Sequence, residues 1–246
     1  MSAVQQTTLR LRELKLAAMA EAYERQLEQP KLHQIDFDSR LAMLVEAEAQ
    51  ARDGRVLKRL IYNADLPESA SLEDVDHRPG RGLDKIQLAS LASCEWVRRK
   101  QNLILIGATG VGKTWLACAF GYQACRLRIP VLFYRASDLY EEIAEAAHTG
   151  ALPKLKQALT KPNILIIDDF GLGEMNLASA QVLLDVIDRR MRASSLIITS
   201  QFPTDAWHGL FPDQTIADAI LDRVVHQAHR LDLKGDSMRK LRAKKA

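Results

Sequence analysis

Cysteine is scarce in this chain of 246 residues, and long apolar runs are missing. The three cysteines, Cys94, Cys118 and Cys125, lack the spacing of metal ligands, and their odd number argues against a disulfide framework. No apolar run approaches the roughly 20 residues of a membrane-spanning helix. The first residues show neither the basic region nor the apolar core of a signal peptide. We therefore expect a cytoplasmic protein that makes no use of a membrane.

A strong charge imbalance is also lacking. Lysine and arginine together number 34 and aspartate and glutamate 31, which gives a formal net charge of +3. This balance permits nucleic-acid binding without arguing for it, so local clusters of charge must decide. The composition is 47% hydrophobic and 26% charged, as in globular proteins, and the length suits one or two domains.

The clearest motif is a glycine-rich loop between a predicted strand and a predicted helix. It follows the apolar run 102–106 and precedes a helical stretch that begins at Trp115. Glycines let successive backbone N–H groups turn inward, and the helix N-terminus adds a partial positive charge, so the loop attracts polyphosphate. A chance match is the alternative, but the flanking order favours a nucleoside triphosphate. The predicted nucleotide-binding residues are Gly107, Ala108, Thr109, Gly110, Val111, Gly112, Lys113 and Thr114.

Paired carboxylates follow a second predicted strand. We expect Lys113 to reach the β- and γ-phosphates and the Thr114 hydroxyl to bind Mg²⁺. Asp168 and Asp169 come directly after the apolar run 164–167. Ligands of parallel sheets sit at the carboxyl ends of strands, so Asp168 is assigned to the metal and Asp169 to the attacking water. A turn at the strand end is the alternative.

Two residues farther along the chain are candidates for catalysis. Gln201 follows the predicted strand 195–199, and its amide is placed to contact the γ-phosphate or the attacking water, unless it only belongs to a turn. Arg223 is a candidate for completing a neighbouring subunit's site, as arginines supplied in trans do in other nucleotide hydrolases. The alternative for Arg223 is an internal ion pair with Asp222 or Asp218.

The order of predicted elements indicates the fold class. Strands alternate with helices across 100–233, which predicts an α/β fold with a parallel sheet flanked by helices. Ahead of this region, 8–29 reads as one amphipathic helix ended by Pro30, and a long second helix is expected to begin near Asp38. The expected domains are an N-terminal helical domain at 1–80 that ends in a linker at 65–83, an ATPase domain at 81–234, and a basic C-terminal tail at 235–246.

Basic side chains cluster on the second predicted helix. Arg52, Arg55, Lys58 and Arg59 share one side, because residues three and four apart lie on the same helix face. The cluster is either a solvated helix end favoured by the helix dipole or a strip that contacts DNA phosphates. The tail likewise suits either a solubilising end or a flexible arm for nucleic acid.

The whole pattern resembles the IstB-like transposition helper ATPases, a branch of the AAA+ superfamily close to the DnaC-type helicase loaders. The nucleotide motifs are shared widely, whereas the N-terminal block and the segment that ends at Arg223 are more specific. The segments that carry the resemblance are 11–16 with Met19 and Ala20, 46–48, 107–114, 166–171, 198–200, 219–223 with His226 and His229, and 234–237 with Arg239.

The resemblance implies an ATPase, with ATP and Mg²⁺ as cofactors, that forms homo-oligomers on duplex DNA. Its other partner would be a cognate transposase, whose target capture it promotes. In this family pattern Asp168 is the Mg²⁺-side acid, Asp169 the catalytic acid, Gln201 the sensor and Arg223 the arginine finger. Glutamate is usual at the position of Asp169, which predicts slow hydrolysis with ATP mainly as a switch. Asparagine is commoner at Gln201, and a smaller or polar residue is frequent at Trp115.

Two other functions use the same phosphate loop. A DnaC-type replicative helicase loader is the main alternative, although 1–80 holds no zinc-type cysteine cluster such as some loaders carry. A small-molecule kinase would leave the N-terminal helices and Arg223 without an obvious use.

Overall fold

The chain divides into two compact units, Met1–Arg59 and Leu60–Ala246. In the computed structural model of the protein the described residues are 2–238, so Arg239 and the rest of the basic tail lie outside them. The unit boundary differs from the one expected at 80/81, because the predicted linker packs within the second unit. No helix in 2–238 combines the length and the hydrophobicity that a bilayer crossing requires.

The first unit is helical and is built around one buried carboxylate. Glu48 accepts hydrogen bonds from the N–H groups of Ala18 and Met19, at 3.0 and 3.3 Å, and so caps the second helix. It also pairs with Arg52 and Arg55, at 2.9 and 3.1 Å. The helices of this part of the chain are α1 (Ala3–Glu13), α2 (Ala17–Glu28), the 3-10 helix η1 (Pro30–Gln34) and α3 (Phe37–Ala64), which continues into the second unit.

The prediction of a single helix over 8–29 is wrong, because α1 and α2 are separate helices. Lys15 adopts a left-handed conformation with φ of 60°. Its N–H donates to Arg12 O, and the N–H of Leu16 donates to Leu11 O, which is the hydrogen-bond pattern of a helix C-terminus usually completed by glycine. Since lysine occupies that position, nothing in the residue types signals the break.

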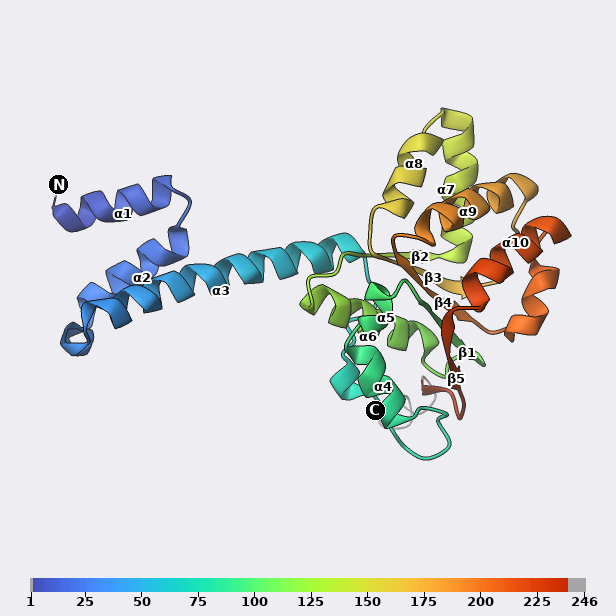
Figure 1. The fold of residues 1–246 in the computed structure, drawn as a ribbon, viewed down its shortest axis with the longest axis horizontal. Coiled ribbons are helices and arrows are strands. Elements are labelled where there is room, and N and C mark those ends of the chain that lie inside the picture. The colour runs from blue at the N-terminus through green and yellow to red at the C-terminus, as the bar shows by residue number, and fades with distance from the viewer. Residues whose placement is uncertain (1, 239–246) are drawn as a thin grey trace. The chain divides into compact units, whose positions relative to one another are not determined.

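The second unit contains a five-stranded parallel sheet in the order β2-β3-β4-β1-β5 (Figure 1). This confirms the predicted α/β class. The strands are β1 (Asn102–Gly107), β2 (Val131–Arg135), β3 (Ile164–Phe170), β4 (Ser195–Ser200) and β5 (Ala228–Leu233). The helices around them are η2 (Leu72–Asp74), α4 (Lys85–Ala92), α5 (Glu95–Arg98), α6 (Lys113–Arg126), α7 (Ala136–Thr149), α8 (Leu152–Thr160), α9 (Leu177–Arg190), η3 (Thr204–Leu210) and α10 (Gln214–Val225).

Helices cover both faces of the sheet, which explains the unbroken apolar runs of its strands. Ile167 belongs to one buried cluster with residues of α7, α8, α9 and α10. Ile166, its neighbour in β3, lies against Gly121 of α6 on the opposite face. The last helix is shorter than the predicted 214–229, and His229 lies on β5.

The segment predicted as a linker is part of the second unit. Leu66 packs against Gly121 of α6, and Val75 is buried. Glu73 forms an ion pair with Arg126, at the end of the same helix. Proline, glycine and acidic residues predict a linker here, but the segment instead packs on α6 through Leu66 and Glu73.

Candidate nucleotide-binding site

The glycine-rich loop connects β1 to α6 as the sequence predicts. Gly107 has φ of 155°, and a Cβ there would lie 2.3 Å from Leu233 O on β5. Gly110 has φ of 86°, and a Cβ there would meet the Ser237 hydroxyl at 2.5 Å. Both positions therefore need glycine for close approach as well as for backbone conformation. The loop ends at the N-terminus of α6, whose unpaired N–H groups favour an anion.

Lys113 lies across the mouth of its own loop. Only 4% of the residue is exposed, and its Nζ donates to Gly107 O at 2.8 Å and to Ala108 O at 3.1 Å. Burial lowers the pKa of Lys113, while the nearby charges of Asp169 and Asp168 raise it. Lys113 is thus held by two backbone carbonyls of its own loop and by no carboxylate of the described chain.

A hydroxyl and a carboxylate meet beside this lysine. Thr114 Oγ1 donates to Asp168 Oδ2 at 2.9 Å, which joins the start of α6 to the end of β3. Asp168 is 1% exposed; burial raises its pKa, and the hydrogen bond from Thr199 opposes that shift. Hydroxyl and carboxylate oxygens are the ligands that Mg²⁺ prefers, so this donor set fits the cation. Thr114 would bind it directly and Asp168 would hold it or its waters.

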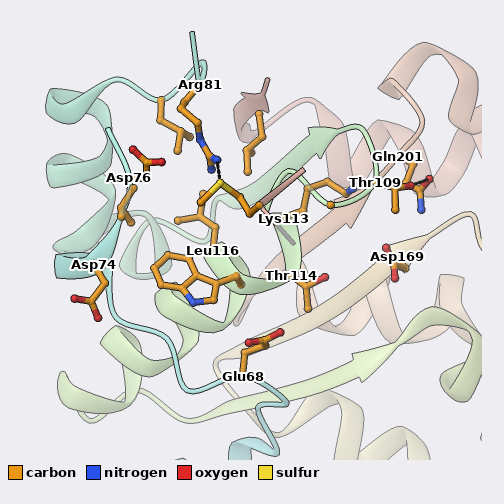
Figure 2. Close-up of a pocket in the computed structure, with 17 residues that line it drawn as sticks. Glu68, Asp74, Asp76, Arg81, Thr109, Lys113, Thr114, Leu116, Asp169 and Gln201 are labelled. Carbon is orange, nitrogen blue, oxygen red and sulfur yellow. Dashed lines mark hydrogen bonds between the residues drawn. The ribbon is translucent and has the colours of Figure 1, made fainter. Parts of the chain in front are cut away.

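Lys113 and Thr114 line a pocket. Asp169 and Gln201 lie at one end of this pocket, and Asp74 and Asp76 lie at the other (Figure 2). The pocket has a volume of about 190 Å³. Gln201 Oε1 accepts a hydrogen bond of 2.6 Å from the Thr109 hydroxyl, so the residue predicted to sense phosphate already contacts the phosphate loop. Lys113 and Thr114, the residue types that bind phosphate and Mg²⁺, thus share this pocket with Asp169 and Gln201.

The far wall of the pocket was missed by sequence reasoning. It comes from the predicted linker, from the first turn of α6, from the end of β5 and from the end of the described chain. Arg81 Nη2 donates to Val111 O in the loop at 3.0 Å, and Gly110 O accepts the N–H of Met238 at 2.9 Å. The pair of glycines around Arg81 was the available signal, because a Cβ at Gly82 would lie 2.1 Å from Asp232 O. The wall residues are Asp74, Val75, Asp76, Arg81, Leu83, Trp115, Leu116, Leu233 and Met238.

Arg223 lies away from this pocket. Its guanidinium pairs with Asp188 of α9 and donates to Ala219 O in its own helix. The ion pair predicted as the alternative therefore exists, but with Asp188 instead of Asp222 or Asp218. Asn102 Nδ2 donates to the neighbouring carbonyl of Val224 at 3.1 Å. Asn102 is the first residue of β1 and Gly107 is the last. Arg223 therefore lies near the N-terminal end of β1, whereas the phosphate loop follows its C-terminal end.

The basic cluster on α3 divides into two pairs. Arg52 and Arg55 bind Glu48, and the hydrogen bond from Arg52 is the main reason that the pKa of Glu48 is lowered. Lys58 and Arg59 are exposed and have no ion pair among the described residues. All four side chains are exposed, so the two pairs differ in their ion pairing: the first pair has a role inside the helical unit, whereas the second pair is not held by an acid of the described chain.

Comparison with known proteins identifies the family. The sequence profile of the family described as IstB-like ATP binding protein matches residues 9–246. The chain belongs to this family. An insertion sequence protein of Sinorhizobium fredii that is named for ATP binding is 38% identical over 232 residues, which cover 94% of each chain. The protein is thus a member of a family of insertion-sequence ATP-binding proteins.

Solved structures share the fold of the second unit. Replication initiator DnaA bound to AMPPCP and single-stranded DNA aligns with a TM-score of 0.57 and 16% identity, over 74% of this chain and 55% of that one. The DnaC helicase loader aligns with a TM-score of 0.52 and 20% identity, over 67% and 97%. At this identity the likeness concerns the fold alone.

Proposed function

We propose that this protein is a Mg²⁺-dependent ATPase that forms oligomers on duplex DNA and promotes target capture by recruiting its cognate transposase. The hydrogen bond between Thr114 and Asp168 carries the proposal, because it joins the cation-binding oxygens beside Lys113 and the phosphate loop. Asp169 and Gln201 line the same pocket, where a γ-phosphate and its attacking water would lie.

Three residues of the pocket, Lys113, Asp169 and Gln201, have proposed tasks in hydrolysis. Lys113 exchanges the carbonyls of its loop for β- and γ-phosphate oxygens. When bound, Mg²⁺ would neutralise charge that develops on those oxygens. Asp169 accepts a proton from the attacking water, and Gln201 orients that water once it leaves Thr109. Because Asp169 is one methylene shorter than glutamate, hydrolysis is slow and ATP serves mainly as a switch.

Arg223 is proposed to act in a neighbouring subunit. It lies near the N-terminal end of β1, away from the phosphate loop at the other end of that strand, so it does not reach the nucleotide site of its own chain. An arginine finger supplied in trans makes hydrolysis depend on assembly, so ATP turnover would report contact between subunits.

The DNA and partner contacts are proposed to lie on the N-terminal helices. The exposed pair Lys58 and Arg59 supports phosphate contacts on α3. The name of the DnaA structure, which reports both a nucleotide analogue and single-stranded DNA, supports a DNA-dependent role for this fold. Such a protein works in the cytoplasm, beside the DNA.

Sedimentation with and without ATP and duplex DNA tests the proposal. The expected result is a large species that needs both ligands and is lost in EDTA. A chain that stays monomeric in every mixture would refute the assembly, and loss of binding at higher salt should accompany true phosphate contacts.

A helicase loader remains the second candidate, because the fold likeness includes the DnaC helicase loader. This alternative expects capture of a replicative helicase in a pull-down and a preference for single-stranded DNA. Capture of a transposase and preference for duplex DNA would decide for the transposition helper.

A further inference from the structure

One buried hydroxyl on β4 touches both carboxylates of the site. Thr199 Oγ1 donates to Asp168 Oδ1 at 2.6 Å and accepts the backbone N–H of Asp169 at 2.9 Å. The residue is fully buried. A hydroxyl has one hydrogen to donate, so its orientation is set by Asp168, while its lone pair serves Asp169.

These hydrogen bonds lie at a bulge in the sheet. The pairing of β3 with β4 runs from Ile167 opposite Ile198 directly to Phe170 opposite Ser200. Two residues of β3 therefore face a single residue of β4, Thr199. The bulge leaves the Asp169 N–H without a ladder partner, and the Thr199 side chain takes that place.

The bulge brings two neighbouring carboxylates to one site. Successive side chains of a regular strand point to opposite faces, so Asp168 and Asp169 would diverge. Asp169 instead has φ of 55°, a left-handed conformation that aspartate tolerates better than most residues but that needs support. The bulge also shifts the alternation of side chains between the two faces of the sheet. Phe170 packs in the same cluster as Ile167, three residues earlier, whereas a regular strand would place these two side chains on opposite faces.

We propose that Thr199 is a positioning residue that holds this bulge and thereby aims Asp168 at the magnesium site and Asp169 at the attacking water. The inference rests on the proposed ATPase function. It concerns binding as well as hydrolysis, because the Asp168 oxygen that faces Thr114 is oriented through the oxygen that Thr199 holds.

The chain offers a matched control in the next residue. Ser200 is also fully buried, and its Oγ donates to Phe170 O of β3 at 2.7 Å. It contacts neither carboxylate through any hydrogen bond among the described residues. Thr199→Val removes the hydroxyl at nearly constant shape, Thr199→Ser retains it, and Ser200→Ala removes the neighbouring hydroxyl.

The experiment measures affinity for a non-hydrolysable ATP analogue by calorimetry, across Mg²⁺ concentrations and in EDTA, and single-turnover hydrolysis in the same samples. Thr199→Val should raise the Mg²⁺ requirement and slow hydrolysis, each about tenfold to 100-fold, as for loss of one hydrogen bond to a charged group. Affinity in EDTA should stay within about twofold, and Thr199→Ser and Ser200→Ala should resemble the unaltered protein.

Several results would overturn the role of Thr199. These are an unchanged Mg²⁺ requirement in Thr199→Val, an equal change in Ser200→Ala, or a failure to fold of both Thr199→Val and Thr199→Ala while Ser200→Ala folds. The last result would assign Thr199 to folding of the sheet. An unaltered protein that binds the analogue but never hydrolyses ATP would refute the proposed ATPase, while the Mg²⁺ titration would still test Thr199.

Discussion

Buried charge is used differently in the two units. In the helical unit, Glu48 is 5% exposed and its oxygens are engaged by two arginines and by the N-terminus of α2. In the sheet unit, Lys113 is equally buried, but it bonds only to carbonyls of its own loop among the described residues. The first arrangement is committed to structure, whereas the second can exchange its partners for a ligand. Burial alone therefore does not identify a functional charge.

Removal of the exchangeable cation should have the largest effect. Lys113→Ala is expected to abolish measurable ATP binding and ATP-dependent assembly, because the desolvated phosphates lose their main counter-charge. Calorimetry with an ATP analogue measures this. The control variant Lys58→Ala, which replaces a lysine of the helical unit, should bind the analogue normally. Normal affinity of Lys113→Ala for the analogue would contradict the difference drawn between the buried charges of Glu48 and Lys113.

The next largest effect is expected at Arg223. Arg223→Ala should leave nucleotide affinity of the monomer unchanged and reduce hydrolysis in the assembly by about 10³-fold, the lower end for arginines supplied in trans. Mixing Arg223→Ala with Asp169→Asn, which should still bind ATP and assemble, should restore part of the rate, since one variant supplies the intact pocket and the other the arginine. Mixtures that stay inactive would place Arg223 outside a shared site.

Asp169→Asn should slow hydrolysis by about 10²- to 10⁴-fold, since the amide cannot accept the proton of the attacking water. The shape of the side chain is kept, so affinity for ATP should change little and the ATP-bound assembly should persist. Quench-flow hydrolysis and analogue binding are the two measurements. Loss of binding would contradict the role of Asp169.

A change at the committed charge should affect stability instead of ligand binding. The pKa of Glu48 is lowered below its ordinary value of 4.5, chiefly by the Arg52 hydrogen bond. The helical unit therefore gains stability above that pH and loses it as the pH falls through the lowered pKa. Glu48→Gln should lower the melting temperature of this unit at pH 7 and reduce its acid dependence, as followed by circular dichroism; the part due to Asp36, whose pKa is lowered by the Ser39 N–H, should remain. Glu46→Gln, on the same helix, is the control.

The smallest effect is expected for the exposed cations. Replacing Lys58 and Arg59 together by alanine should make the dependence of DNA affinity on salt shallower, by about 1.8 in log–log slope if each contacts one phosphate. Replacing Arg52 and Arg55 should change the slope less and the stability more, because both bind Glu48. Equal slopes in the two double variants would remove the distinction between the pairs.

Local patterns explain why much of the nucleotide site could be predicted. The phosphate loop is contiguous, and glycine spacing, strand and helix all lie within a few residues of Lys113. Asp168 follows from the rule that ligands gather at the carboxyl ends of parallel strands. The linker prediction was wrong because proline and glycine mark turns whether or not the chain packs. Arg81 became part of a pocket wall only through its contacts with Val111 of the phosphate loop and with Lys234 after β5.

The sequence by itself determined the alternation of strands and helices, the phosphate loop and the carboxylates, because each is written in residues close together along the chain. Only the tertiary structure decided the break at Lys15, the bulge opposite Thr199 and the position of Arg223 near the N-terminal end of β1. These depend on hydrogen bonds and packing between segments that are distant in sequence. Residue type restricts such contacts but does not specify them.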